Sequence, residues 1–212
     1  MPDNGLIAEQ LQADLARDGI GPEIIVLDQA GSTNDAILQI ANSNSKEGLV
    51  VFAEHQTAGR GQRGNRWESA AGKGLWFSIL LRPRIDLARS PQLTTWAAEA
   101  IFEAIQNEFP LIPTIKPPND VQINGGKVAG VLVEMKAQQN APHLAIAGIG
   151  VNVNQAREDF PKELQSRAIS LAMVLGKQVD RQSFAVALLR KLDRTYRTRF
   201  ASVGQKVTKL NG

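Results

Sequence analysis

Residues 59–67 read Gly59-Arg60-Gly61-Gln62-Arg63-Gly64-Asn65-Arg66-Trp67, with three glycines, three arginines and one indole. Glycine lets the backbone adopt positive φ and lets N–H groups approach a ligand closely, while guanidinium groups match the oxygens of phosphates and carboxylates. The composition therefore predicts a loop that binds an anion. A solvated surface turn is the alternative that these residues alone leave open.

The segments on either side of this loop decide the fold class. Residues 49–53 and 75–81 are both short and apolar, as expected of buried strands, so the loop joins two strands. The spacing Gly59-x-Gly61-x-x-Gly64 matches the dinucleotide-binding pattern, but that site needs a helix directly after the loop. Residues 65–69 start no convincing helix before the next glycines, and the sequence therefore argues against a Rossmann fold.

The remaining hydrophobic pattern predicts a mixture of helices and hairpin strands. Helices are predicted at residues 4–18, 91–108, 168–175 and 181–200, and one starts near Ser32 and Thr33. Strands are predicted at residues 23–28, 49–53, 75–81, 121–123, 127–134 and 144–154, with a tight turn at Asn124-Gly125. Alternation along the last strand places Asn152 and Asn154 on one face. Ser32 or Thr33 is either a helix N-cap or a ligand contact.

Composition excludes several classes of protein. The 24 Lys and Arg against 21 Asp and Glu give a net charge of +3, which is too small for a dedicated nucleic-acid binder and favours a local anion site. The absence of cysteine excludes disulfides, thiolate nucleophiles and Cys-based metal sites. Ordinary structural roles are expected for His55 and His143. Without a signal-like start or a long apolar run, we expect a cytoplasmic protein with no membrane partner.

Five short motifs, in order, resemble the biotin protein ligase family. They are Gly31-Ser32-Thr33-Asn34, Gln56-Thr57-Ala58-Gly59-Arg60-Gly61 through Trp67, Pro118-Asn119-Asp120, Lys127-x-x-Gly130-x-Leu132-x-Glu134 and Gly148-Ile149-Gly150-Val151-Asn152. Each motif is weak alone, but their order and spacing across residues 24–200 are highly specific. The resemblance implies an α+β fold with a central mixed, largely antiparallel sheet flanked by helices, as in class II aminoacyl-tRNA synthetases.

The resemblance also implies a two-step reaction. The carboxylate of biotin attacks the α-phosphate of ATP to give biotinyl-5'-AMP, and a lysine of a biotin carboxyl carrier protein then attacks this mixed anhydride. Magnesium would accompany ATP. No nucleic acid is expected as a partner, and the protein would be a monomer or a homodimer.

By the same resemblance, individual residues receive expected roles. Lys127 and Arg60 would be catalytic, supplying positive charge at the phosphate. The biotin-binding residues would be Ser32, Thr33, Asn34, Gln56, Gly59, Arg60, Gly61, Lys127, Gly148 and Gly150. The ATP-binding residues would be Arg63, Arg66, Trp67, Lys116, Asn119 and Asn152. Asp120 and Asn152 would be the magnesium ligands, since magnesium prefers oxygen donors.

The sequence departs from the family pattern in places. Gln62 stands where the family usually has arginine, which affects the grip on the adenylate, and Pro117 stands where it usually has tryptophan. We expect residues 1–212 to form a single catalytic domain, without an amino-terminal winged helix or a full carboxy-terminal β-barrel. Two alternatives remain: a lipoate or octanoate ligase or transferase of the same superfamily, and a non-enzymatic biotin-sensing regulator.

Overall fold

The computed structural model describes residues 5–15, 19–41, 45–138 and 143–200. Its strands form one sheet of seven, in the order β1-β2-β3-β7-β6-β5-β4. The strands are β1 Ile24–Ala30, β2 Val50–Gln56, β3 Gly74–Leu81, β4 Thr114–Lys116, β5 Asp120–Ile123, β6 Gly126–Lys136 and β7 Leu144–Asn152. β1 pairs with β2 in parallel and every other neighbouring pair is antiparallel. The predicted mixed, largely antiparallel sheet is confirmed.

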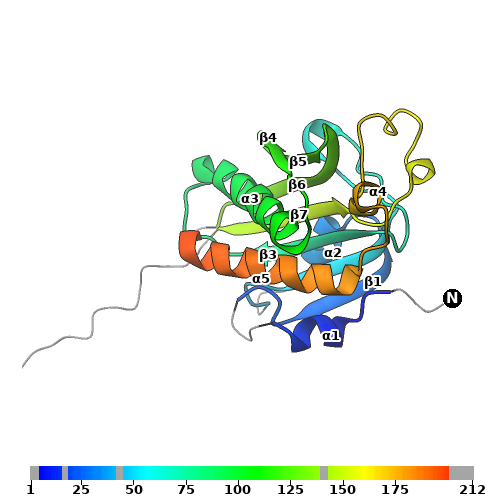
Figure 1. Cartoon of the computed structure of the whole chain (residues 1–212). Helices are drawn as coiled ribbons and strands as arrows, with labels where there is room; N and C mark the ends of the chain where they lie inside the picture. The colour runs from blue at the N-terminus through cyan, green and yellow to red at the C-terminus, as the bar shows by residue number, and fades with distance from the viewer. Residues whose placement is uncertain (1–4, 16–18, 42–44, 139–142, 201–212) are drawn as a thin grey trace, which may run out of the picture.

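Helices cover both faces of this sheet. They are α1 Ala8–Ala13, α2 Thr33–Ile40, α3 Pro91–Glu108, α4 Leu171–Leu175 and α5 Arg181–Phe200, with short 3-10 turns η1 Gln62–Gly64, η2 Leu87–Arg89 and η3 Arg157–Asp159. Figure 1 shows α3 and α5 side by side in front of the sheet, while α2 lies behind it. The bounds of α3 and α5 match the prediction, whereas α1 is shorter than the predicted helix 4–18, of which residues 4 and 16–18 lie outside the described residues.

The core forms two layers because the sheet is buried on both sides. Every residue of β3 is buried, which explains why its sequence is apolar on both faces except at Ser78 rather than alternating. On the α3 and α5 side, Trp96 is fully buried and packs against Tyr196 of the predicted inward stripe. On the α2 side, a smaller cluster consists of Ile37, Leu49, Val51, Leu80 and Ile146.

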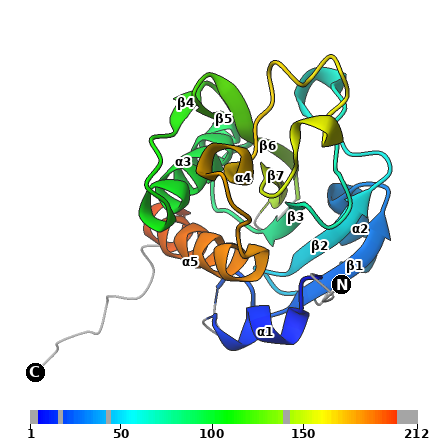
Figure 2. The ribbon, with the colours of Figure 1, turned by 45° about the vertical axis from the view of Figure 1, so that its right-hand side comes forward.

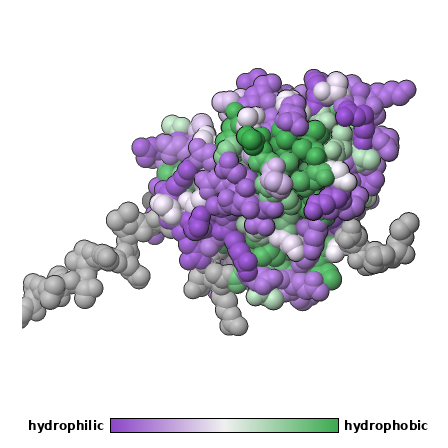
Figure 3. All heavy atoms as spheres, in the orientation of Figure 1, coloured by the Kyte–Doolittle hydropathy of each residue, from purple (hydrophilic) through white to green (hydrophobic). Residues whose placement is uncertain are grey.

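The loop between β2 and β3 and the segment after β7 lie together at one end of the sheet, as both ribbon views show (Figures 1 and 2). β2 and β3 are antiparallel and the loop contains only the short turn η1, so the expectation against a Rossmann site is confirmed. Hydrophilic residues cover most of the face seen in Figure 3, with a hydrophobic area near its upper centre. None of the described helices combines the length and hydrophobicity that crossing a membrane requires.

Two expectations about single residues have different outcomes. The turn at Asn124 and Gly125 is confirmed, since both residues have positive φ, at 50° and 78°. The pairing of Asn152 and Asn154 on one strand face is wrong, because β7 ends at Asn152. Asn154 instead exchanges two hydrogen bonds with the backbone of Val179 and has a structural role.

Candidate functional site

Two neighbouring cavities contain most of the predicted site residues. The first, here called the network cavity, has a volume of about 40 Å³ and is lined by Ser32, Thr33, Asn34, Gln56, Arg60, Gly61, Gln62, Trp67, Asn119, Lys127, Gly130, Val131, Leu132, Gly148, Ile149 and Gly150. The second, the charged cavity, measures about 440 Å³ and is lined by Asn65, Arg66, Trp67, Glu68, Lys116, Asp120, Gln122, Gly125, Lys127, Asn152, Phe160, Leu164, Arg167 and Ala168. Trp67 and Lys127 line both cavities and therefore lie at their junction.

Glycines on β6 and β7 make room for side chains that cross the sheet. A β-carbon placed on Gly148 would lie 2.3 Å from Asn34 Oδ1, and one on Gly150 would lie 2.5 Å from Cε2 of Trp67. One on Gly130 would lie 2.9 Å from the same indole. The Trp67 ring therefore rests on two strands through their missing side chains. Its indole N–H is buried and makes no hydrogen bond within the described part of the chain, so it can donate to a ligand oxygen.

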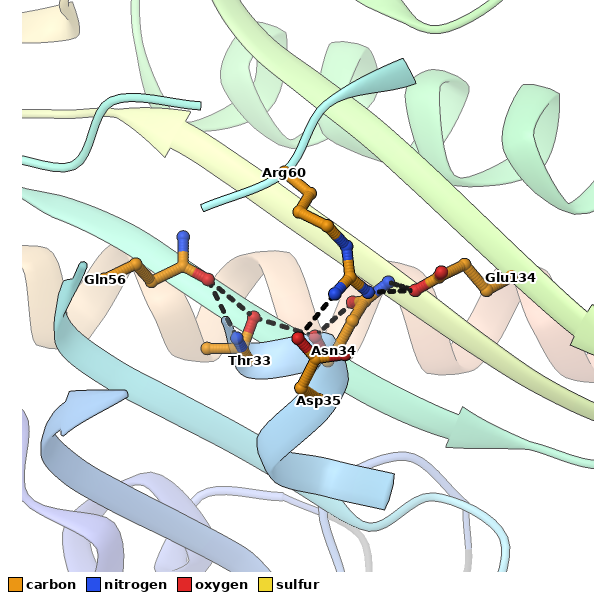
Figure 4. A network of polar contacts seen from close by, with 7 residues as sticks. Thr33, Asn34, Asp35, Gln56, Arg60 and Glu134 are labelled. Carbon is orange, nitrogen blue, oxygen red and sulfur yellow. Dashed lines mark hydrogen bonds and ion pairs between the residues drawn. The ribbon is translucent and has the colours of Figure 1, made fainter. Parts of the chain in front are cut away.

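A chain of polar groups, most of them buried, borders the network cavity, and Figure 4 shows its contacts. The backbone N–H of Thr33 donates to Gln56 Oε1 at 2.8 Å, and the Thr33 hydroxyl lies 3.2 Å from the same oxygen. Ser78 Oγ lies 2.8 Å from Thr33 Oγ1 and 2.6 Å from Asn34 Oδ1. Asn34 Nδ2 then donates to Glu134 Oε2 at 2.6 Å. The chain therefore links α2, β2, β3 and β6.

The chemistry of these groups determines the direction of each hydrogen bond. A carboxylate only accepts, so Asn34 must turn its nitrogen to Glu134 and its oxygen to the Ser78 hydroxyl. The Thr33 N–H likewise requires the oxygen of Gln56, which leaves the Gln56 nitrogen facing Gly59, within 3.1 Å of where a β-carbon there would lie. Gly59 does not line the network cavity, but its lack of a side chain leaves room for this amide.

Ser32 lies at the N-cap position of α2, yet its side chain makes no capping hydrogen bond. Ser32 is 4 % exposed and lines the network cavity. Because the hydroxyl is not used to cap the helix, it remains a ligand donor or acceptor at the cavity wall. Of the two expectations for this residue, the geometry therefore favours the ligand contact.

Arg60 ends in an ion-pair cluster. One guanidinium nitrogen donates to Asp35 Oδ2 and the other lies 2.8 Å from Glu134 Oε2. The hydrogen bond to Asp35 raises the pKa of Arg60 above its usual value, partial burial opposes this, and Glu134 adds to the rise. Arg60 is thus held as a cation by two carboxylates at the same end of the cavity as Asn34.

Arg60 and Lys127, the two cations expected at the phosphate, are held by different partners. Glu134, which holds Arg60, is four residues from Gly130 on β6, or roughly 13 Å along the strand. Lys127 Nζ lies 3.1 Å from where a β-carbon on Gly130 would be. Both cations line the network cavity, but their anchors lie at different positions along β6.

Lys127 lies at the junction with two partners. Its ammonium is 2.6 Å from Asp120 Oδ1 and 5.2 Å from the centroid of the Trp67 ring. The ion pair and the cation–π contact hold the ammonium beside Gly130, on a side chain that is one-third exposed. Lys127 is thus ordered where the two cavities meet.

The glycine loop is folded on itself. The N–H of Gly61 donates to Asn65 O and the N–H of Trp67 donates to Gly59 O. Arg60 and Arg66 face each other in an antiparallel bridge, and Arg63 has a φ of 58°. The expectation of loop N–H groups as anion donors does not hold for Gly61 and Trp67 in this conformation, because both already donate inside the loop.

The residues expected to bind ATP are divided between the cavities. Arg66, Lys116 and Asn152 line the charged cavity, and Trp67 lies at the junction. Asn119 lines the network cavity instead, where its Nδ2 donates to Val131 O, and Arg63 is exposed and lines neither cavity.

Several lining residues were not predicted. Phe160, Leu164 and Arg167 complete the charged cavity from the segment after β7, and no local pattern marks them. Ser78 had a signal that sequence reasoning passed over, since it is the one polar residue in an otherwise apolar strand and is fully buried.

The fit to magnesium can be tested on the donor groups. Among the described residues, no three His, Cys, Asp or Glu side chains converge as a metal cage. Asn152 Oδ1 accepts a hydrogen bond from Gln155 and Asp120 pairs with Lys127. These residues fit a magnesium ion that arrives with phosphate oxygens and gains one protein carboxylate, rather than an ion held by the protein alone.

The sequence of this chain is similar to those of known proteins. Bifunctional ligase/repressor BirA of Bacillus subtilis (strain 168) is 39% identical over 192 residues, which are 91% of this chain and 59% of that protein. The biotin–[acetyl-CoA-carboxylase] ligase of Paracoccus denitrificans is 37% identical over 162 residues, which are 75% of this chain and 67% of that protein. This chain therefore spans less than two thirds of the length of the Bacillus relative.

A solved structure and a family profile agree with these relatives. The structure of biotin protein ligase from Aquifex aeolicus in complex with biotin and ATP superposes with a TM-score of 0.70 at 29% identity, covering 84% of this chain and 73% of that one. The profile of the Biotin/lipoate A/B protein ligase family matches residues 26–152, which extend from β1 to the end of β7. With the matching sheet, the glycine loop and Lys127 all inside that span, this chain belongs to the Biotin/lipoate A/B protein ligase family.

Proposed function

We propose that this chain activates biotin with ATP and transfers it to a lysine of a biotin carboxyl carrier protein. The observation that carries the proposal is the pair of adjoining cavities, one lined mostly by neutral groups with Arg60 among them and the other lined by many charged groups, with Lys127 at their junction. A ureido ring offers two N–H donors and one carbonyl acceptor. The hydroxyls of Ser32 and Thr33 and the amide nitrogen of Gln56 supply matching acceptors and a donor.

In the first step, biotin's carboxylate would lie at the junction and ATP in the charged cavity. A carboxylate is ionised at neutral pH, so its attack on the α-phosphorus needs no general base. The new P–O bond forms as the bond to pyrophosphate breaks, and Lys127 stabilises charge on the phosphate and carboxylate oxygens. Magnesium bound to ATP would neutralise phosphate charge, and Asp120 would be a candidate carboxylate to hold it.

The cations of the charged cavity suit the nucleotide. Arg66, Lys116 and Arg167 are exposed and reach it from three separate segments. Their positive charge attracts ATP and then favours retention of the adenylate until the carrier arrives.

In the second step, the neutral amine of the carrier lysine attacks the carbonyl carbon of biotinyl-AMP. AMP leaves with the electrons of the broken C–O bond, and the nitrogen loses a proton as the amide forms. Covering the anhydride with the glycine loop would exclude water and so protect biotinyl-AMP from hydrolysis.

The test is the release of pyrophosphate from ATP and magnesium in the presence of biotin, lipoate or octanoate, each tested alone. We expect pyrophosphate with biotin and transfer of biotin to an added carrier domain. Pyrophosphate release with lipoate or octanoate but not biotin would replace this proposal with the lipoate branch of the family. Biotin binding without any pyrophosphate would instead favour a biotin-sensing regulator.

A further inference from the structure

We propose that Asp35, Arg60 and Glu134 form a clamp that holds the glycine loop over the network cavity and sets how long a bound acid and its adenylate are retained. This inference rests on the proposed function for the identity of the acid. It makes Asp35 and Glu134 positioning residues that act through Arg60, and it gives Arg60 a role at the ring end rather than at the phosphate.

The clamp ties together three separate parts of the fold (Figure 4). Arg60 extends from the loop, Asp35 belongs to α2 and Glu134 to β6, at sequence separations of 25 and 74 residues. The two carboxylates lie on either side of one guanidinium, whose planar fork can donate to both at once. The loop cannot lift from the sheet without breaking both ion pairs.

The clamp also separates two spaces. Arg60 lines the network cavity on one side and, on the other, an outer cavity of about 250 Å³ that Asp35, Glu134 and Lys136 also line. The guanidinium is therefore part of the wall between them. If it swung away, the network cavity would open to the outer cavity and water could reach the polar end of a bound ring.

Glu134 links the clamp to the ligand-binding wall. Its Oε2 accepts from Arg60 at 2.8 Å and from Asn34 Nδ2 at 2.6 Å. Asn34 is 3% exposed and directs its oxygen to Ser78, so the charge of Glu134 orients the amide and the hydroxyl chain behind it. Within the described contacts, Asp35 takes no part in that chain and acts on the clamp through Arg60 alone.

The expected effects differ between the two carboxylates. Exposed ion pairs contribute little, and the side chains of Arg60 and Asp35 are 38% and 48% exposed, so Asp35→Asn should weaken biotin binding about threefold. Glu134→Gln removes the negative charge from the acceptor of two hydrogen bonds, one of them from a buried amide. This variant should weaken biotin binding roughly tenfold. Dissociation of biotinyl-AMP should accelerate by similar factors, while the KM for ATP and the single-turnover rate of adenylation change less than twofold.

The experiment compares wild type, Asp35→Asn, Glu134→Gln and Arg60→Met in biotin calorimetry, adenylate release and the KM for ATP. Glu103→Gln is the matched control, because it breaks an ion pair of similar length with Lys191 between α3 and α5, away from both cavities. In the Arg60→Met background, Asp35→Asn should have no further effect, whereas Glu134→Gln should keep a residual effect through Asn34. Asp35→Glu, which keeps the charge, should restore part of the affinity lost in Asp35→Asn.

The clamp is overturned if Asp35→Asn and Glu134→Gln leave biotin affinity unchanged and instead raise the KM for ATP or slow adenylation, since Arg60 would then act at the phosphate. A measurement that needs no ligand distinguishes failure of the clamp from failure of the proposed function. Trypsin should cleave after Arg60, Arg63 or Arg66 several-fold faster in Asp35→Asn and Glu134→Gln than in Glu103→Gln. Equal cleavage rates overturn the clamp even if biotin is not the substrate, and a wild type that binds no biotin overturns only the proposed function.

Discussion

The network cavity and the charged cavity adjoin each other but are built in opposite ways. In the network cavity, Thr33, Asn34 and Gln56 are 3–8% exposed and already bonded to one another and to Ser78. In the charged cavity, Arg66, Lys116 and Arg167 are exposed and come from separate segments. One wall is therefore organised before the ligand arrives, while the other depends on the ligand's charge.

The two cavities also differ in volume. The charged cavity, at about 440 Å³, lies within the usual range for ligand pockets, but the network cavity, at about 40 Å³, is far below that range. Its polar wall is preformed while its space is filled, because Trp67 lies across Gly130 and Gly150. Binding of a ring must move Trp67 or the glycine loop. The two cavities should therefore respond differently to mutation.

The largest effect is expected at the junction. Lys127→Ala should leave the fold intact but slow single-turnover adenylate formation by roughly 10²–10³, because it removes a preorganised charge at the phosphate. Lys116→Ala, which removes an exposed cation from the charged cavity, should mainly raise the KM for ATP. If Lys127→Ala formed adenylate at the wild-type rate, Lys127 would be an ordinary paired surface lysine.

The second effect concerns Gln62, which lines the network cavity. A neutral amide there lacks the charge-assisted hydrogen bond that an arginine would give the adenylate. The expected difference in affinity for the adenylate is about tenfold to hundredfold. We expect wild type to release biotinyl-AMP and to label a bystander protein such as serum albumin, and Gln62→Arg to suppress that labelling. Equal bystander labelling by both, at similar carrier rates, would mean that a neighbouring arginine already supplies the contact.

The third effect distinguishes the two cavities through alanine substitutions of two glycines on β7, Gly148 and Gly150. Gly148→Ala would push against Asn34 Oδ1, so the KM for biotin should rise by roughly tenfold while that for ATP stays unchanged. Gly150→Ala would push against Trp67, which lines both cavities, so both KM values should rise. Steady-state kinetics with each substrate varied in turn checks the contrast, and identical profiles for the two variants would contradict it.

The smallest effect is expected beside the charged cavity. Burial alone would raise the pKa of Asp159, but hydrogen bonds from Lys73 and from the backbone N–H of Ala156 lower it overall. A lowered folded pKa means that the stabilisation is present above the unfolded pKa, about 3.9, and is lost as the pH falls through the folded value.

Asp159→Asn should therefore lower the free energy of unfolding by up to about 1 kcal/mol at pH 7, as for a partly exposed pair. The difference from wild type should disappear in strong acid. Urea unfolding of both proteins from pH 7 downward measures it, and a difference that grew toward low pH would reverse the assigned sign.

Much of the fold follows from local sequence. α3 and α5 match their predicted bounds because an apolar stripe repeated over 18 and 20 residues leaves little ambiguity. The turn at Asn124-Gly125 needs positive φ at both residues, which these two residue types tolerate best. α1 is less predictable, since a six-residue helix depends on its contacts with β1 and α5 more than on its own sequence.

The sequence by itself determined which residue types are present for a site: the glycine loop, the arginines, Lys127 and the paired glycines of β7. These features are recognised from the spacing of residues that are close together in the sequence. Only the tertiary structure decided which partners they have. Arg60 turns toward Asp35 and Glu134 rather than toward Lys127, and Trp67 lies on Gly130 and Gly150. A side chain's direction depends on strand register and on groups far away in sequence, and no local pattern encodes that information.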